Sequence, residues 1–286
     1  MNQIQWYPGH MAKARREAKE KLNLVDIVIE LVDARIPESS RNPIIQEIIA
    51  NKPSILVLNK SDLADPQVTK KWLEEYKSQG QTALAIDAQH SKGLKELTNT
   101  CKFLMNDYFE KQKRKGVKPR AIRLMILGIP NVGKSTLINR FVGKNQAQTG
   151  NKPGVTKAQR WLKIGKDFEL LDTPGILWPK FEDPATGHYL ALTGAIKDQL
   201  LEMQELSLGF IQYLQQFYPT ILEENYQIGP TKDKTPAEVL SLLTKKFGMG
   251  EDYHQAAEKL IQDFRQHKLG NISLDQPIES TDYHEK

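Results

Sequence analysis

The sequence predicts an α/β domain, built on a mostly parallel sheet with helices on both faces, followed by a small all-α domain. Short apolar runs rich in β-branched residues are typical of buried strands, and amphipathic helical patterns separate them. Alternating strands and helices favour a parallel sheet that is covered on both sides. After about Trp178 the strand-like runs stop and only helical patterns follow.

The expected parallel strands are, in chain order, IVIELVDA (Ile27–Ala34), SILVLNK (Ser54–Lys60), TALAIDA (Thr82–Ala88) and AIRLMILG (Ala121–Gly128). Helical patterns lie between them in NPIIQEIIAN, PQVTKKWLEEYKSQG and SKGLKELTNTCKFLMNDYFEKQKRK. The run RWLKIGKDFELLD predicts a hairpin around Gly165 and Lys166. Ligands of such sheets bind beyond the carboxyl ends of the strands. The strand ends that mark the expected site are therefore Asp33, Asn59, Asp87, Gly128 and Asp172.

Three helical stretches are expected in the second domain: residues 186–218, 235–248 and 252–270. Thr235 and Glu238 form a capping box, with Pro236 at the first helical position, and Gly270 is the expected end of the last helix. The predicted division is 1–178 for the α/β domain, 179–274 for the helical domain and 275–286 for a loose tail.

Composition and charge indicate a soluble intracellular protein with a polyanionic partner. The chain has 39% hydrophobic and 26% charged residues, one cysteine (Cys101), no signal-peptide core and no apolar run of membrane-spanning length. The first 179 residues carry 30 Lys and Arg against 18 Asp and Glu, whereas the remainder carries 10 against 17. The basic excess lies in an N-terminal segment (1–21) and in KQKRKGVKPR (111–120), which we expect to join two parts of the α/β domain.

The stretch GIPNVGKS, from Gly128 to Ser135, matches a phosphate-binding loop between a strand and a helix. Glycines allow backbone N–H groups to approach a phosphate, and the helix N-terminus adds a positive end. Lys134 is expected to bridge β- and γ-phosphate oxygens, and the Ser135 hydroxyl to ligate Mg²⁺. The nucleotide contacts expected in this loop are Asn131, Val132, Gly133, Lys134, Ser135 and Thr136.

Two downstream elements fit a switch that senses the γ-phosphate. DTPG places Asp172 on the Mg²⁺ side and Gly175 at the γ-phosphate. Thr156, in the loop NKPGVTKAQR between these motifs, is expected to ligate Mg²⁺ when the γ-phosphate orders that loop.

The stretch NKSD, from Asn59 to Asp62, predicts that the base is guanine. The Asp62 carboxylate can accept from both N1–H and N2–H₂ of guanine, whereas adenine would leave it unpaired. Lys60 is expected to cover the base, Asn59 to tie the base loop to the phosphate loop, and the backbone of Asp87 and Ala88 to contact guanine O6. The base reader precedes the phosphate loop, the reverse of the usual order, which predicts a circularly permuted P-loop GTPase domain.

With these motifs in place, the chain resembles the ribosome biogenesis GTPase A family of circularly permuted bacterial GTPases over nearly its whole length. The markers are WYPGHMAKA (Trp6–Ala14), VDARIPESSRNP (Val32–Pro43), NKSD, GIPNVGKST, PGVT and DTPG, in that order. The resemblance implies a cytoplasmic GTPase that binds a late precursor of the large ribosomal subunit, promotes its maturation and leaves after hydrolysis. It also implies rRNA contacts by the C-terminal domain, although the charge distribution favours the two basic segments.

Ile176 follows the DTPG motif, where many GTPases have a water-positioning glutamine, so slow hydrolysis by the free protein is expected. The family resemblance points to His10 as the group that orients the water. Asn131 also resembles the asparagine of potassium-activated GTPases, which implies that it helps to hold K⁺. The expected catalytic residues are thus His10, Lys134 and Thr156, in a protein that is monomeric when free. A nucleotide-gated scaffold or signalling adaptor with little hydrolysis of its own is the alternative function.

Overall fold

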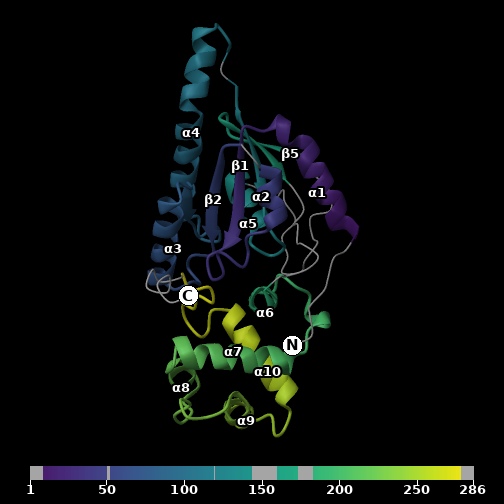
Figure 1. Ribbon diagram of the computed structural model, residues 1–286, viewed down its shortest axis with the longest axis vertical. Coiled ribbons are helices and arrows are strands. Elements are labelled where there is room, and N and C mark those ends of the chain that lie inside the picture. Colours follow the sequence, from purple (N-terminus) through teal and green to yellow (C-terminus); the bar gives the residue numbers. More distant parts are fainter. Residues whose placement is uncertain (1–8, 50–51, 119, 144–159, 173–182, 278–286) are drawn as a thin grey trace, which may run out of the picture.

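The structure, a computed structural model, describes residues 9–49, 52–118, 120–143, 160–172 and 183–277 (Figure 1). It confirms the predicted fold class. Six strands form one sheet in the order β3-β2-β1-β4-β6-β5, and every neighbouring pair is parallel except β5 with β6. The strands are β1 (Ile27–Asp33), β2 (Ser54–Asn59), β3 (Ala83–Ala85), β4 (Ile122–Leu127), β5 (Arg160–Ile164) and β6 (Phe168–Asp172).

Strand β1 lies in the middle of the sheet and joins its two halves. It pairs with β2 on one side and with β4 on the other, although residues 34–121 separate β1 from β4 in the chain. Asp33 lies opposite Asn59 in this register, so the carboxyl ends of β1 and β2 present both side chains at one edge. The permuted order of the motifs is therefore compatible with one continuous sheet.

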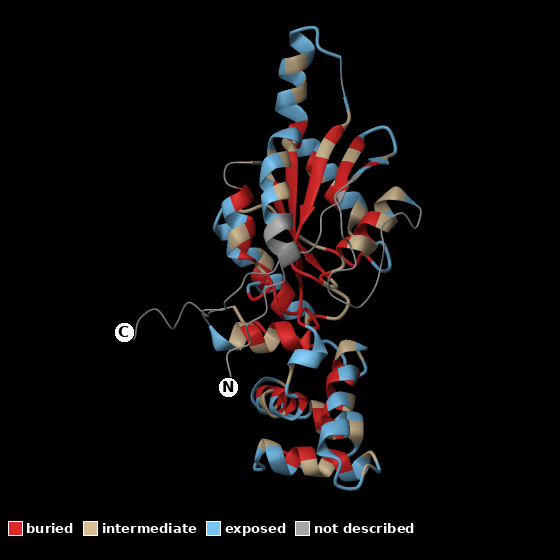
Figure 2. Ribbon diagram, turned by 90° about the vertical axis from the view of Figure 1, so that its right-hand side faces the viewer, coloured by how far each residue is buried: buried red, intermediate tan, exposed pale blue. Residues whose placement is uncertain are grey.

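Helices cover both faces of the sheet, as the alternation predicted. The helices of this domain are α1 (Gly9–Lys21), α2 (Pro43–Ile49), α3 (Pro66–Ser78), α4 (Leu94–Arg114) and α5 (Lys134–Val142). Alternate residues of β1 point to opposite faces: Ile27 packs with α4 and α5, whereas Val28 packs with α1 and α2. Figure 2 shows the buried strands between helices with exposed outer faces.

The C-terminal part is helical, with α6 (Pro184–Leu192), α7 (Met203–Phe217), α8 (Ile221–Tyr226), α9 (Pro236–Lys246) and α10 (Tyr253–Arg265). The capping box of Thr235 and Glu238 is present at the start of α9. The apolar core of this part is continuous with the sheet core under α4 and α5. Among the described residues, no helix is both long and apolar enough to cross a bilayer.

Three predictions for this part were wrong in detail. The helix expected over 186–218 is divided, because Gly194 (φ +79°) follows the end of α6. Helix α10 ends at Arg265 rather than at Gly270, since His267 adopts a positive φ and the Lys268 N–H bonds back to the Asp263 carbonyl. Asp275, assigned to a loose tail, is 8% exposed and accepts two hydrogen bonds from Ser39.

Candidate functional site

The phosphate loop connects β4 to α5, and close backbone approaches require its glycines. A Cβ at Gly128 would lie 2.4 Å from the Leu31 carbonyl oxygen. Gly133 has φ +97°, and a Cβ there would lie 2.3 Å from Nδ2 of Asn59. Asn131 also has a positive φ, and no side chain caps the N-terminus of α5. Left-handed residues beside an uncapped helix N-terminus form a typical anion-binding concavity.

Lys134 is the first residue of α5 and is only 7% exposed. Its ammonium group donates to the backbone carbonyls of Gly128 (3.1 Å) and Ile129 (2.7 Å). These bonds place a buried positive charge on the phosphate loop itself. Ser135 and Thr136 follow in the first helical turn, both half-buried. A hydroxyl next to this lysine is the arrangement that binds phosphate-bound Mg²⁺ in phosphate-loop proteins.

Asn59 ties three loops of the site together. Its Nδ2 donates to the Val132 carbonyl in the phosphate loop (2.8 Å), and its Oδ1 accepts from the Ala88 N–H (3.1 Å). Asn59, Val132 and Ala88 are all buried. One amide side chain thus fixes the base loop, the phosphate loop and the loop after β3 relative to one another, as the sequence led us to expect for the first two.

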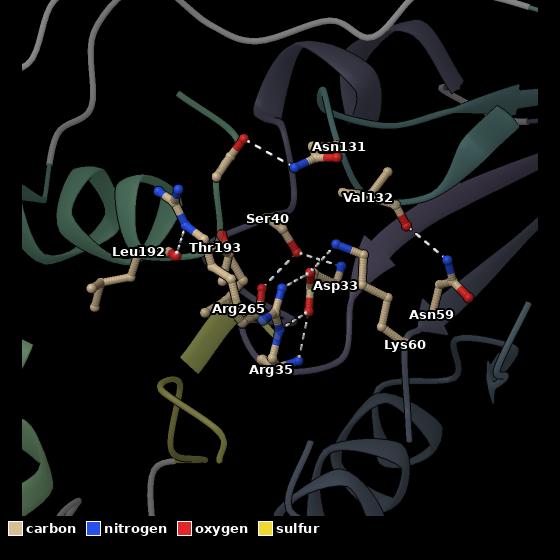
Figure 3. Close-up of polar contacts among 12 residues, drawn as sticks. Asp33, Arg35, Ser40, Asn59, Lys60, Asn131, Val132, Leu192, Thr193 and Arg265 are labelled. Carbon is tan, nitrogen blue, oxygen red and sulfur yellow. Dashed lines mark hydrogen bonds and ion pairs between the residues drawn. The ribbon is translucent and has the colours of Figure 1, made fainter. Parts of the chain in front are cut away.

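A buried ion cluster lies at the end of β1 (Figure 3). Arg35 donates from Nε (3.0 Å) and Nη2 (2.8 Å) to the two carboxylate oxygens of Asp33, and Nζ of Lys60 donates to the same carboxylate (2.9 Å). Burial alone would raise the pKa of Asp33, but the charges of Arg35 and Lys60 outweigh burial and hold it well below the ordinary value. The Lys60 backbone has φ +61°, and the side chain is held at Asp33 by this ion pair. The ion cluster itself was not predicted from the sequence.

Asp62 lies close to Asp87 and His90, with one ligand atom of each within 4.8 Å of the others. The Asp87 carboxylate is already engaged, because it bonds the His90 ring (Nδ1, 2.7 Å) and the His90 N–H (2.9 Å). The Asp62 carboxylate has no hydrogen-bond partner among the described residues. The Asp62 carboxylate suits the paired N–H donors of guanine better than a cation, since Nδ1 of His90 and the Asp87 carboxylate are already bonded to each other.

The site also contacts the helical domain through Asn131, whose Nδ2 donates to the Gly194 carbonyl (3.2 Å) (Figure 3). Arg265 of α10 holds the same segment: it donates to the carbonyls of Leu192 (2.9 Å) and Ala191 (2.8 Å) and pairs with Asp198. Neither contact was predicted from the sequence. The phosphate loop is therefore bonded directly to the end of α6.

Several predicted residues, or their side chains, lie outside the part of the chain that the structure describes. Thr156 and Gly175 lie outside the described residues, as does Ile176. Asp172 ends β6 and His10 lies in α1, but their side chains are likewise outside the described part. The hydroxyl of Ser135 and the oxygens that Thr156 and Asp172 would offer are of the type that Mg²⁺ prefers, so the donor set fits this ion.

Comparison with known proteins agrees with this geometry. Residues 123–239 match the protein family described as 50S ribosome-binding GTPase. The chain is 53% identical over 283 residues to Ribosome biogenesis GTPase A of Priestia megaterium, covering 97% of this chain and 98% of that protein. It is 50% identical over 281 residues to the protein of the same name from Bacillus cereus, covering 96% and 95%.

Solved structures of YlqF from T. maritima show the same fold. A GDP-bound structure matches with a TM-score of 0.67 and 25% identity, covering 92% of this chain and 100% of that one. A GNP-bound structure matches with a TM-score of 0.63 and 27% identity, covering 93% and 99%. The likeness extends across both the α/β part and the helical part of the chain.

Proposed function

The chain belongs to the ribosome biogenesis GTPase A family, and from that premise we propose that it is a GTP-hydrolysing assembly factor for a late precursor of the large ribosomal subunit. The proposal places it in the cytoplasm, monomeric when free, with residues 1–178 as the GTPase domain and 179–274 as the helical domain. The observation that carries it is Asn59, which joins the base loop to the phosphate loop across the permuted sequence. The alternative of a scaffold without hydrolysis is not favoured, because the full-length relatives are named GTPases.

The residues of the pocket divide the work of binding GTP. Asp62 would accept from the guanine N1–H and N2–H₂, with Asp87 and Ala88 beside the O6 edge. Lys134 would contact the β- and γ-phosphates from the position where it bonds the loop carbonyls. Val132, Gly133, Ser135 and Thr136 would surround the phosphates, with Gly175 at the γ-phosphate.

Mg²⁺, held by Ser135, Thr156 and Asp172, would neutralise charge on the β- and γ-phosphates when bound. We further propose that Asn131 holds K⁺ beside the phosphates. Its Nδ2 bonds Gly194, and its Oδ1 accepts no hydrogen bond within the described part of the chain, so this oxygen is available to a cation. Since Ile176 cannot position water, His10 is the group proposed to do so when ribosomal particles order the N-terminal segment.

The end of α4 is the surface that we propose for rRNA. Its last turn and the following residues carry exposed basic side chains, with no acidic residue among them and no ion pair to any other described residue: Lys111, Lys113, Arg114, Lys115 and Lys118. Helix α4 runs past the sheet at the end opposite the helical domain (Figure 1). This end faces away from the nucleotide edge, since the chain next enters β4 at its first residue, Ile122. This surface is consequently expected to add affinity that does not itself change with the nucleotide, while the nucleotide-dependent part of particle binding comes from elsewhere in the protein.

A salt titration tests this surface. Lys113→Glu with Arg114→Glu and Lys115→Glu should weaken binding to large-subunit particles and reduce the slope of log affinity against log salt by about 2–3, at about 0.7–0.9 per phosphate contact. Lys245→Glu with Lys246→Glu is the matched control on the exposed end of α9. Equal losses in both variants would move the RNA contact away from α4, and an unchanged slope in the α4 variant would remove it.

The experiment for the enzymatic proposal is GTP turnover with and without purified large-subunit precursors. The wild-type protein should release phosphate slowly alone and faster with particles, and Lys134→Ala should abolish both rates. Turnover by Lys134→Ala at the wild-type rate would mean that this pocket is not the hydrolytic site.

A further inference from the structure

A segment after α10, residues 271–275, returns from the helical domain to the α/β domain, and we call it the strap. All of it except Asn271 is buried. Ile272, Ser273 and Leu274 are at most 1% exposed. On one side, the Ser273 carbonyl accepts from the Tyr213 hydroxyl of α7 (2.8 Å), and the Ser273 N–H donates to the Tyr218 hydroxyl (3.0 Å). The strap is thus fixed to the helical domain.

On its other side, the strap is fixed to the α/β domain. The Leu274 N–H donates to the Arg35 carbonyl (2.7 Å), next to the buried ion cluster. The Trp72 Nε1–H of α3 donates to the Asp275 carbonyl (3.1 Å). Ser39 donates to the two oxygens of the Asp275 carboxylate from its N–H and its hydroxyl, both at 2.6 Å. These bonds come from two elements, the loop between β1 and α2 and helix α3, so the strap has one defined position between the two parts.

The strap also holds the backbone of residues 62–65, which begin at the last residue of the base-reading stretch NKSD. Nδ2 of Asn271 donates to the carbonyls of Asp62 and Ala64, both at 2.8 Å. The Ile272 N–H donates to the Leu63 carbonyl (3.2 Å), and the Asp65 N–H donates to the Ser273 hydroxyl (3.1 Å). Because the Asp62 carboxylate itself has no hydrogen-bond partner among the described residues, its position depends on the backbone that the strap holds.

We propose that Asn271 is a positioning residue for guanine recognition: from the strap, which is bonded to the helical domain, it fixes the backbone of Asp62 and so links the placement of that domain to base selectivity. This inference rests on the proposed function, because it assumes that Asp62 reads guanine. It differs from the link through Asp172 and Gly175, since it acts on the base loop rather than on the γ-phosphate. A helical domain displaced on a ribosomal particle would loosen the strap and with it the grip on the nucleotide.

Ordinary packing between domains is the simpler explanation for the strap. Substitution of Asn271 distinguishes this explanation from a positioning role. Its side chain is exposed, so its bonds add little to the free energy of unfolding. A purely structural role predicts no change in the choice between bases. A positioning role predicts that selectivity for guanine falls, because the 2-amino group contacts Asp62.

The test compares GTP with inosine triphosphate, which lacks the 2-amino group, in titration calorimetry of the full chain. Asn271→Ala should lower the ratio of GTP affinity to inosine triphosphate affinity by about twofold to tenfold, the equivalent of one net hydrogen bond. Asn225→Ala is the matched control. Asn225 also donates from Nδ2 to two backbone carbonyls, of Ile221 (2.8 Å) and Leu269 (3.4 Å), but away from the base loop.

A wild-type ratio in Asn271→Ala, or an equal loss in Asn225→Ala, would overturn the inference. Linkage is reciprocal, so GDP binding should slow hydrogen exchange at the amides of Ile272 and Leu274, and unchanged exchange there would overturn it as well. Asp62→Ala keeps this failure distinct from failure of the proposed function. If Asp62→Ala lowers the ratio and Asn271→Ala does not, the pocket stands and only the strap's role is rejected.

Discussion

Replacing Asn59 by Ala should separate the two halves of the nucleotide pocket. The change deletes the bonds to the Val132 carbonyl (2.8 Å) and from the Ala88 N–H (3.1 Å), and both partners lie in buried loops. A buried polar group left without a partner costs about 1–3 kcal/mol, so two such groups give about 2–6 kcal/mol. Water can enter the space that the smaller side chain leaves, so we expect a loss at the lower end of this range, about 2–3 kcal/mol.

The loss should be measured both without and with nucleotide. In chemical denaturation, the free energy of unfolding of the nucleotide-free protein should fall by about 2 kcal/mol, and GDP affinity in titration calorimetry should fall by at least about tenfold. Asn99→Ala, at an exposed asparagine of α4, is the control and should change neither quantity. If Asn59→Ala loses stability but binds GDP within twofold of wild type, the bond to Val132 is structural only, and our account of how the permuted halves form one pocket is wrong.

Four further predictions address other groups. Asp62→Asn should weaken GTP binding by roughly 2–4 kcal/mol and favour xanthosine nucleotides, which calorimetry checks; unchanged GTP affinity would reject Asp62 as base reader. If Asn131 holds K⁺, GTP turnover should be several-fold faster in potassium than in sodium at equal ionic strength, and Asn131→Ala should erase the difference, whereas equal wild-type rates would exclude potassium. Burial raises the pKa of Asp275 from 3.8 to about 6. Between these two pH values the carboxyl group is protonated in the folded protein but not in the unfolded chain. Stability should therefore fall as pH rises from about 4 to above 6, and Asp275→Asn should flatten the melting temperature over that range, where parallel curves would contradict us. His10→Ala should leave GTP affinity and particle binding near wild type but remove most of the particle-stimulated rate, and full stimulation of the mutant would assign the water to another group.

The sequence predicted those parts of the site whose residues are neighbours in the chain. The phosphate loop and the base loop each follow a strand directly, so a short motif fixes residue type, backbone conformation and sheet edge together. Gly128 and Gly133 illustrate this, because the close approaches of Leu31 and Asn59 exclude any other residue there. The apolar runs predicted where the strands lie, because each run is itself continuous in the chain. Strand β3, however, is shorter than the run TALAIDA suggested.

Two of the contacts that the sequence did not predict are long-range bonds between a side chain and a backbone carbonyl. Asn271 bonds Asp62, and Asn131 bonds Gly194, across large separations in the chain. Such bonds leave no periodic pattern, since a single polar residue in a loop usually faces solvent. Arg35 was quoted only as part of a motif, because a charge two residues beyond a strand is compatible with an exposed turn as well as with the buried pair to Asp33.

The sequence also did not predict where the helices of the C-terminal part end. Gly270 has a positive φ, as expected of a residue that ends a helix, but the turn at His267 had already ended α10. A non-glycine residue in this conformation carries no sequence signal. The same turn directs the chain back toward the α/β domain and so makes the strap possible.

Co-sedimentation with large-subunit precursors tests the central claim most directly, because it joins the nucleotide pocket to the partner in one measurement. The wild-type protein should pellet with the particles in the presence of a non-hydrolysable GTP analogue and remain in the supernatant with GDP, and Asp62→Asn should regain particle binding when a xanthosine triphosphate analogue replaces the guanosine one. Equal pelleting with the GTP analogue, with GDP and without nucleotide would show that the pocket does not control the partner, and would contradict the account.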